Sequence, residues 1–250
     1  MCIIAVNKSK SLLSEETLNN CWNNNPDGAG IMYAIDNKLY VYKTMKKHKL
    51  IKKYKEIREK YPDIDIVLHF RLATHGSVNI DNVHPVVINK DIAFVHNGII
   101  NEVMNTSFAL KYKDYSDTRV FGKMIEGTAD RIFVDKGLQE LLESYIGHSK
   151  IVFMNNYGEI LTLNKSYGVY DREGNWFSNN TYQYNVSKLW SLNPIFRKSN
   201  NKYKGYRVLS NQFDFDELYE HDFLDEKLLE DRNSNKENTN SWDWFDRTLY

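Results

Sequence analysis

The first residues of the chain alternate between apolar and polar blocks in a way that predicts a strand followed by a helix. The apolar run at residues 2–6, Cys-Ile-Ile-Ala-Val, indicates a short buried strand. Ser14 has the chemistry of a helix N-cap, and two glutamates follow it in the first turn, where the helix dipole favours negative charge. We expect this helix to end near Trp22, in a turn that is rich in Asn and Pro.

A hairpin and a basic helix are predicted next. Residues 31–34 and 39–42 favour two strands, and Asp36-Asn37 is typical of the turn between them. From Lys46 to Tyr61, apolar residues recur every three to four positions and define one face of a helix. Its lysines are interpreted as a solvated face rather than a phosphate site.

Two further predicted strands end in polar clusters. Residues 64–70 are predicted as a strand that leads into Arg71-Leu72-Ala73-Thr74-His75-Gly76. Residues 92–95 lead in the same way into His96-Asn97-Gly98. The end of a buried strand is a position where a scaffold holds side chains rigidly in a cleft, so both clusters are candidates for function.

The remaining pattern predicts two helices and then four short strands. Ser116-Asp117-Thr118 has N-cap chemistry before one helical stripe, and residues 136–145 form another. Strands are expected at 150–154, 159–163, 168–171 and 175–178, joined as hairpins. Helices grouped between blocks of antiparallel strands indicate an α+β fold rather than a βαβ repeat.

The character of the chain changes after about residue 185. We expect one domain over residues 2–185 and a C-terminal extension over residues 186–250. Within the extension, residues 213–232 predict an acidic helix and residues 233–240 a polar linker. Three large aromatic residues within 242–250 suggest either docking on the domain itself or binding to a partner.

Composition narrows the classes of function. Lys plus Arg and Asp plus Glu both number 33, which argues against bulk binding to nucleic acid or to an anionic membrane. No apolar run is long enough to span a bilayer and the N-terminus has no signal segment, so we expect a cytoplasmic protein. Two cysteines are too few for a disulfide framework, and the spacing of the histidines predicts no metal site.

Cys2 is the strongest candidate nucleophile. If Met1 is removed, Cys2 carries a thiol and a free α-amine on one residue. An α-amine has a pKa of about 7.7–8, so it can take the thiol proton without a His or Asp partner. Such covalent catalysis needs no cofactor. The alternative is that Cys2 is a small buried hydrophobe in a strand.

Three further features fit the chemistry of an amino-acid amide. Arg71 offers a planar fork for a carboxylate, and Asp117 offers an anion for an ammonium group. Asn97 and Gly98 offer a side-chain amide and a backbone N–H side by side, which could hold the oxyanion of a tetrahedral intermediate. Each feature alone also has a structural interpretation. Arg71 could belong to an ion pair, Asp117 could cap a helix, and Asn97-Gly98 could form a hairpin turn. Together with a thiol they describe a site for an amino-acid amide such as glutamine.

These residues also carry a family resemblance. The chain resembles the class II glutamine amidotransferase domain, of the N-terminal-nucleophile (Ntn) hydrolase type, which is the glutaminase half of enzymes such as glucosamine-6-phosphate synthase. The resemblance covers roughly residues 2–180. The matching stretches, in the order of the family, are Met1-Cys2, Asn25-Pro26-Asp27-Gly28-Ala29-Gly30, His69 to Gly76, His84-Pro85, His96-Asn97-Gly98 and Ser116-Asp117-Thr118.

The resemblance implies a four-layer αββα sandwich and a role for each matching residue. Cys2 would be the nucleophile, and Asn97 and Gly98 the oxyanion hole. Arg71 and Asp117 would bind the α-carboxylate and α-ammonium of glutamine, and Thr74 and His75 would line its pocket. His84 matches a histidine near the pocket and is given no role. Leu72 departs from the family, where a bulky aromatic residue is common.

The sequence therefore predicts a glutaminase that releases glutamate and ammonia from L-glutamine through a Cys2 thioester. No acceptor domain follows the matching region, so we expect ammonia to pass to a separate synthetase or transferase. Two alternatives stay open: an Ntn-type cysteine amidase or peptidase acting on another amide, and a non-catalytic binding protein on the same scaffold.

Overall fold

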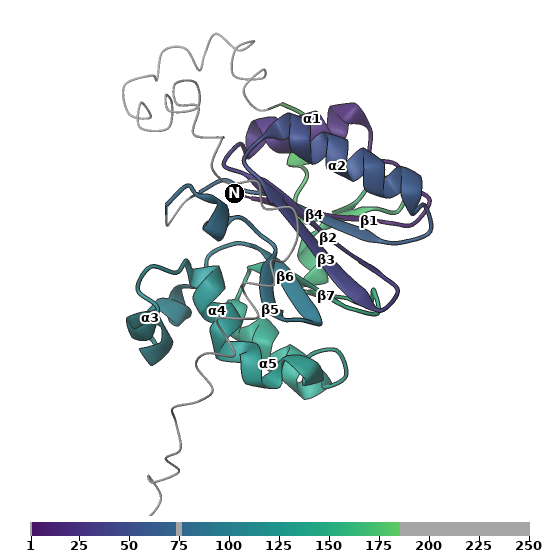
Figure 1. Ribbon diagram of the computed structural model, residues 1–250. Helices are drawn as coiled ribbons and strands as arrows, with labels where there is room; N and C mark the ends of the chain where they lie inside the picture. Colours follow the sequence, from purple (N-terminus) through teal and green to yellow (C-terminus); the bar gives the residue numbers. More distant parts are fainter. Residues whose placement is uncertain (1, 74–76, 186–250) are drawn as a thin grey trace, which may run out of the picture.

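The computed structural model describes residues 2–73 and 77–185, which form two antiparallel sheets and the helices that cover them (Figure 1). Three features predicted above lie outside the described residues: Met1, the pair Thr74 and His75, and the whole extension 186–250. The division of the chain into a domain and an extension therefore stays a prediction.

The larger sheet holds six strands, all antiparallel to their neighbours. In spatial order they are β3 (Lys38–Thr44), β2 (Ala29–Ile35), β4 (Ile66–Phe70), β1 (Ile3–Asn7), β10 (Trp176–Phe177) and β9 (Val169–Tyr170). All five residues of β1 are buried, and β1 pairs with β4 from Ile3 opposite Phe70 to Asn7 opposite Ile66. The predicted N-terminal strand is thus at the centre of the sheet.

The smaller sheet holds four antiparallel strands. In spatial order they are β5 (Val86–Asn89), β6 (Ile92–Asn97), β7 (Lys150–Asn155) and β8 (Ile160–Leu163). The sequence pattern does not predict β5, which is a four-residue, partly buried edge strand with an irregular register against β6. Such a strand has too few buried positions to produce a clear alternation.

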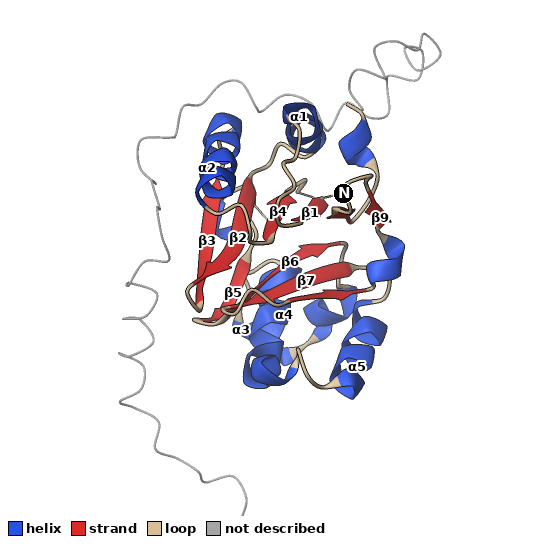
Figure 2. Ribbon diagram, turned by 90° about the vertical axis from the view of Figure 1, so that its right-hand side faces the viewer, coloured by secondary structure: helices blue, strands red, loops and turns tan. Residues whose placement is uncertain are grey.

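The helices cover the outer faces of the two sheets, so that the molecule has four layers (Figure 2). The α-helices are α1 (Glu15–Asn24), α2 (Lys47–Lys60), α3 (Ser107–Lys111), α4 (Asp117–Ile125) and α5 (Lys136–Ile146). Short 3₁₀ helices are η1 (Ile80–Asn82), η2 (Asn101–Asn105), η3 (Glu126–Arg131), η4 (Lys165–Tyr167) and η5 (Thr181–Gln183). Helices α1 and α2 lie on the six-stranded sheet, and α3 to α5 lie on the other. The α+β fold class and the αββα order of layers are confirmed.

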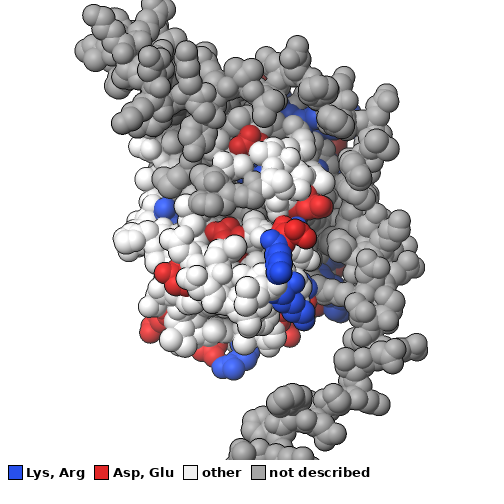
Figure 3. All heavy atoms as spheres, turned by 90° about the vertical axis from the view of Figure 1, so that its left-hand side faces the viewer, with Lys and Arg blue, Asp and Glu red and all other residues white. Residues whose placement is uncertain are grey.

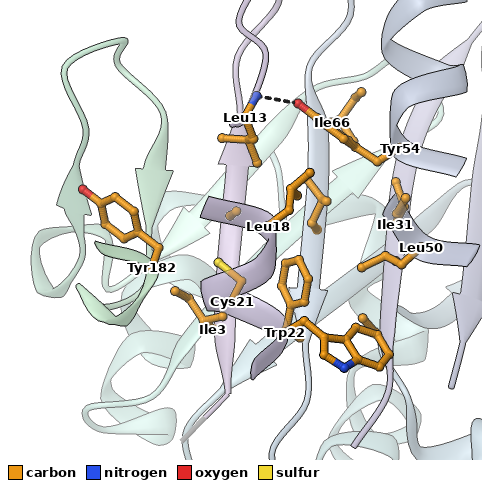
Figure 4. Close-up of a cluster of buried hydrophobic side chains, with 14 of the residues drawn as sticks. Ile3, Leu13, Leu18, Cys21, Trp22, Ile31, Leu50, Tyr54, Ile66 and Tyr182 are labelled. Atoms are coloured by element: carbon orange, nitrogen blue, oxygen red, sulfur yellow. Dashed lines mark hydrogen bonds between the residues drawn. The ribbon is translucent and has the colours of Figure 1, made fainter. Parts of the chain in front are cut away.

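Three apolar clusters hold these layers together. The one beneath α1 and α2 contains Leu18, Cys21 and Tyr54 (Figure 4). Ser14 caps α1 as predicted, since its side chain accepts a hydrogen bond from the Thr17 N–H. The Tyr54 hydroxyl accepts from the Leu13 N–H at 2.9 Å, which satisfies a buried backbone donor inside the cluster. Cys21 is fully buried in the same cluster, so it is a structural residue of the core.

On one face of the described molecule, acidic and basic side chains both occur among uncharged ones (Figure 3). This distribution agrees with the balanced composition of the whole chain. Among the described helices, none combines the length and the apolar character that a bilayer crossing requires.

Candidate active site

Cys2 lies directly before β1, and its thiol contacts the segment that follows β4. The Cys2 Sγ accepts a hydrogen bond from the Leu72 N–H at 3.3 Å and lies 3.5 Å from the Leu72 carbonyl oxygen. Burial raises the pKa of the Cys2 thiol, while the hydrogen bond with Leu72 and the charge of Arg71 act in the opposite direction. The thiol is half-buried, and it is protonated at neutral pH unless a base acts on it.

The turn before β2 fixes the position of residues 71–73. The Arg71 N–H donates to the Gly28 carbonyl at 2.8 Å, and the Asp27 N–H donates to the Arg71 carbonyl at 3.0 Å. The Asp27 carboxylate accepts from the Ala73 N–H at 2.8 Å. The Asn-Pro-Asp-Gly motif thus holds residues 71–73 in place through hydrogen bonds, next to the Cys2 thiol. The sequence did not predict this role for Asp27.

Arg71 is buried at the centre of a group of charged and nucleophilic side chains. Its guanidinium donates to the Ser77 carbonyl at 3.2 Å. Burial lowers the pKa of Arg71, and the Cys2 thiol and the carboxylates of Asp27 and Asp117 each raise it. These three groups therefore lie within electrostatic reach of one guanidinium. The structure brings together the predicted nucleophile, the predicted carboxylate binder and the predicted ammonium binder.

Asp117 is the first residue of α4 and is half-buried. Ser116, one residue earlier, caps the helix by accepting from the Arg119 N–H, so the Asp117 carboxylate is not needed for the cap. That carboxylate instead accepts from the Ile100 N–H at 3.0 Å, which ties α4 to the loop after β6. The sequence predicts that Asp117 either caps the helix or binds an ammonium group. The structure does not support the role as a cap, because Ser116 caps α4.

Asn97 and Gly98 lie at the end of β6. The Asn97 side chain is 1 % exposed and its amide is 2.7 Å from the Ser178 hydroxyl oxygen. Gly98 has a φ of 149°, and a Cβ at this position would lie 2.0 Å from the Ser149 Oγ. Only glycine fits there without a rearrangement. The backbone at Gly98, directly after Asn97, therefore keeps a conformation that a larger residue would disturb.

Three buried histidines lie with their rings next to one another. His84 lies with its ring centroid 4.2 Å from that of His69 and 6.3 Å from that of His96. The His96 Nδ1 is 2.8 Å from the Thr118 hydroxyl, which in turn donates to Asp117. No group of three or more metal-ligating side chains occurs in the part of the chain that the structure describes. The three rings contact one another, and His96 is linked to Asp117 through the Thr118 hydroxyl.

Two residues after β10 also reach the nucleophile's strand, and the sequence analysis did not identify them. Ser178 exchanges hydrogen bonds with Ile4, and Asn179 donates to the Cys2 carbonyl at 3.0 Å. The only sequence signal is the polar run Ser178-Asn179-Asn180, which follows a short strand. Their contacts span 174 and 177 positions along the chain, beyond the range of any local pattern.

Curated proteins with related sequences include two bacterial enzymes of one kind. Over 98 residues, 36% of this chain, it is 34% identical to a glutamine-fructose-6-phosphate aminotransferase (isomerizing) of Buchnera aphidicola subsp. Baizongia pistaciae. Over 107 residues, 41% of the chain, it is 31% identical to the protein of the same name in Helicobacter pylori. The alignments span 16% and 18% of the two relatives' lengths. The resemblance to class II glutamine amidotransferases is confirmed in the aligned part.

Solved structures give weaker matches, on which we base no inference. The chain aligns over 71% of its length with the allosteric regulatory enzyme of purine biosynthesis, at 17% identity and a TM-score of 0.44, covering 41% of that chain. A glutamine phosphoribosylpyrophosphate amidotransferase of B. subtilis gives 16% identity and a TM-score of 0.43 over the same shares. No family model matches the chain.

Proposed function

We propose that this chain, which resembles the class II glutamine amidotransferases, hydrolyses L-glutamine to glutamate and ammonia through a thioester on Cys2. The observation that carries the proposal is the grouping of Cys2 and Asp117 around the guanidinium of Arg71. Arg71 would bind the α-carboxylate and Asp117 the α-ammonium. Free glutamine is the substrate class that offers both charges together with an amide for the thiol.

Acylation begins with transfer of the thiol proton. After removal of Met1, the α-amine of Cys2 takes that proton, and the Sγ attacks the Cδ of the glutamine side chain. The carbonyl oxygen becomes an oxyanion that the Asn97 amide and the Gly98 N–H stabilise. Collapse of the intermediate breaks the C–N bond, and the proton on the amine passes to the leaving nitrogen, so that ammonia is released.

Deacylation follows the same path with water. The α-amine takes a proton from water as its oxygen attacks the thioester carbonyl, and the oxyanion forms in the same place. When the C–S bond breaks, glutamate is released and the proton returns to the sulfur. Because burial raises the thiol pKa, the resting thiol is neutral and depends on the amine as its base. The Leu72 N–H stabilises the thiolate that forms transiently.

The destination of the ammonia is a separate part of the proposal. The relatives are named for transfer of an amino group from glutamine to fructose 6-phosphate, and this chain aligns with less than a fifth of each of them. We propose that a separate synthetase or transferase accepts the ammonia. A reducing, cytoplasmic location suits a chain whose nucleophile is one of only two cysteines.

A glutaminase assay tests this function. Purified protein incubated with L-glutamine should release glutamate and ammonia in equal amounts, and the Cys2→Ala variant should release neither. Peptide-embedded or N-acylated glutamine should be a poor substrate, because it offers no free ammonium to Asp117. Equal hydrolysis of free and peptide-embedded glutamine would instead indicate a cysteine peptidase. Absence of ammonia release, without and with candidate acceptor enzymes, would indicate a non-catalytic protein.

A further inference from the structure

Ser178 connects the strand of the nucleophile to the predicted oxyanion residue in the other sheet. Its Oγ accepts a hydrogen bond from the Ile4 N–H at 2.9 Å, and its own N–H donates to the Ile4 carbonyl at 3.0 Å. The same Oγ lies 2.7 Å from the Asn97 side-chain amide. Ser178 is fully buried, so these contacts are made without competition from solvent.

The hydrogen-bond capacity of this trio decides how the Asn97 amide is oriented. With the Nδ2 toward Ser178, the hydroxyl accepts two hydrogen bonds, and the Asn97 Oδ1 is buried with no donor among the described residues. A half-turn of the amide exchanges oxygen and nitrogen at the same positions. The hydroxyl then accepts from the Ile4 N–H and donates its own proton to the Asn97 Oδ1. This exchanged orientation gives every oxygen of the trio a partner and places the Asn97 Nδ2 at the buried position that has no partner among the described residues.

We infer that Ser178 is a positioning residue that holds the Asn97 Oδ1 and thereby leaves the Nδ2 as a free donor for the oxyanion. This inference rests on the proposed glutaminase function. An amide that faces the reaction with its oxygen would repel the oxyanion, whereas one that faces it with two N–H groups stabilises it. Orientation of Asn97 therefore decides whether it helps or hinders the reaction.

The location of Ser178 supports this role. It directly follows β10, which pairs with β1, and its neighbour Asn179 donates to the Cys2 carbonyl at 3.0 Å. One short segment thus contacts residue 2, residue 4 and residue 97. The nucleophile and the oxyanion donor belong to different sheets, and Ser178 provides a direct hydrogen-bonded connection between them.

The first test is kinetic. Ser178→Ala should lower kcat for glutamine by about ten- to a hundredfold, which is less than the roughly hundred- to thousandfold loss expected for Asn97→Ala. KM should stay within about twofold in both variants, because neither residue holds the charged groups of the substrate. Alkylation of Cys2 by iodoacetamide should proceed at the wild-type rate in Ser178→Ala, since that reaction forms no oxyanion.

A double-mutant cycle separates positioning from packing. If Ser178 acts through Asn97, removal of its hydroxyl should have almost no effect on kcat in the Asn97→Ala background. Ser11→Ala is the matched control, because Ser11 is also buried and hydrogen-bonded, to Glu173 and Asn175, away from the thiol. This control should keep the wild-type kcat.

A second test measures the orientation of the Asn97 side-chain amide by NMR and does not depend on turnover. In wild-type protein labelled with ¹⁵N-asparagine, the side-chain amide protons of Asn97 should show no strong nuclear Overhauser effect to the Ser178 β-protons. A strong effect would place the Nδ2 beside Ser178 and overturn the inference. Wild-type kcat in Ser178→Ala, or equal losses in both backgrounds of the cycle, would also overturn it and leave the glutaminase function intact. A wild-type protein that releases no ammonia would refute the function itself.

Discussion

The Leu72 N–H donates to the Cys2 sulfur at 3.3 Å, although 70 positions separate the two residues. The register of the central strands explains the contact. Ile3 lies opposite Phe70 at the end of the β1–β4 pair, so Cys2 directly precedes one strand where Arg71 directly follows the other. The same pairing therefore places the nucleophile beside both the backbone N–H that contacts the sulfur and the guanidinium proposed to bind substrate.

Arg71→Lys should weaken glutamine binding. Lysine keeps the charge but loses the planar pair of donors, and loss of a hydrogen bond to a charged group corresponds to roughly 1.5–3 kcal/mol. We expect KM to rise about ten- to a hundredfold with little change in kcat, measured by steady-state glutaminase kinetics. Arg58→Lys is the control, because Arg58 is equally buried but donates to Asn7, Pro62 and Ile64. It should lower the free energy of unfolding and leave KM unchanged; an equal rise in KM in both variants would argue against substrate binding by Arg71.

Asp117→Asn should reduce the preference of the enzyme for a free amino group. The asparagine oxygen can still accept from the Ile100 N–H, so the loop after β6 keeps its anchor, but the negative charge is lost. We expect the ratio of kcat/KM for glutamine to that for its analogue without the amino group to fall about ten- to a hundredfold. Asp135→Asn, at the start of α5, should leave this ratio unchanged. An unchanged ratio in Asp117→Asn would refute the role in ammonium binding.

The buried histidines should make the fold sensitive to acid. Burial lowers the pKa of His69 to about 3 and that of His96 to about 4. The unfolded chain binds these protons near pH 6.5, whereas the folded chain does not bind them until about pH 4 or below. The unfolded state therefore binds more protons in this window, and the free energy of unfolding should fall as pH falls, by up to about 1.4 kcal/mol per pH unit for each histidine.

Urea unfolding between about pH 7 and pH 4 measures this dependence. His96→Asn should flatten the slope, since it removes one of the groups that titrates only in the unfolded state. His48→Gln, at an exposed position on α2, should keep the wild-type slope. A stability that does not change across this range in the wild-type protein would contradict the burial of neutral histidines.

The sequence predicted those parts of the fold whose signals are local. Ser14 as a cap depends on its own neighbours, and the Asp36-Asn37 turn depends on two residues with positive φ of 50° and 59°. The candidate site was predicted for a different reason, since its residues follow one another in motifs that match a family. Ser178 and Asn179 could not be predicted, because their roles arise from strand pairing across nearly the whole domain.

The role of Leu72 could not be predicted from its side chain either. Its side chain departs from the family resemblance, yet its contact with the thiol comes from the backbone N–H, which any residue except proline provides. The departure at residue 72 therefore concerns the surroundings of the pocket and leaves this hydrogen bond in place.

In the proposed reaction Cys2, as a processed N-terminus, forms a covalent intermediate with glutamine. Protein quenched in acid during turnover can be digested, and its N-terminal peptide analysed by mass spectrometry. We expect a peptide that begins at Cys2 and carries the additional mass of one γ-glutamyl group, while the peptide that contains Cys21 carries none. Active protein whose N-terminal peptide keeps Met1, or whose γ-glutamyl group is found on Cys21, would contradict the proposed reaction.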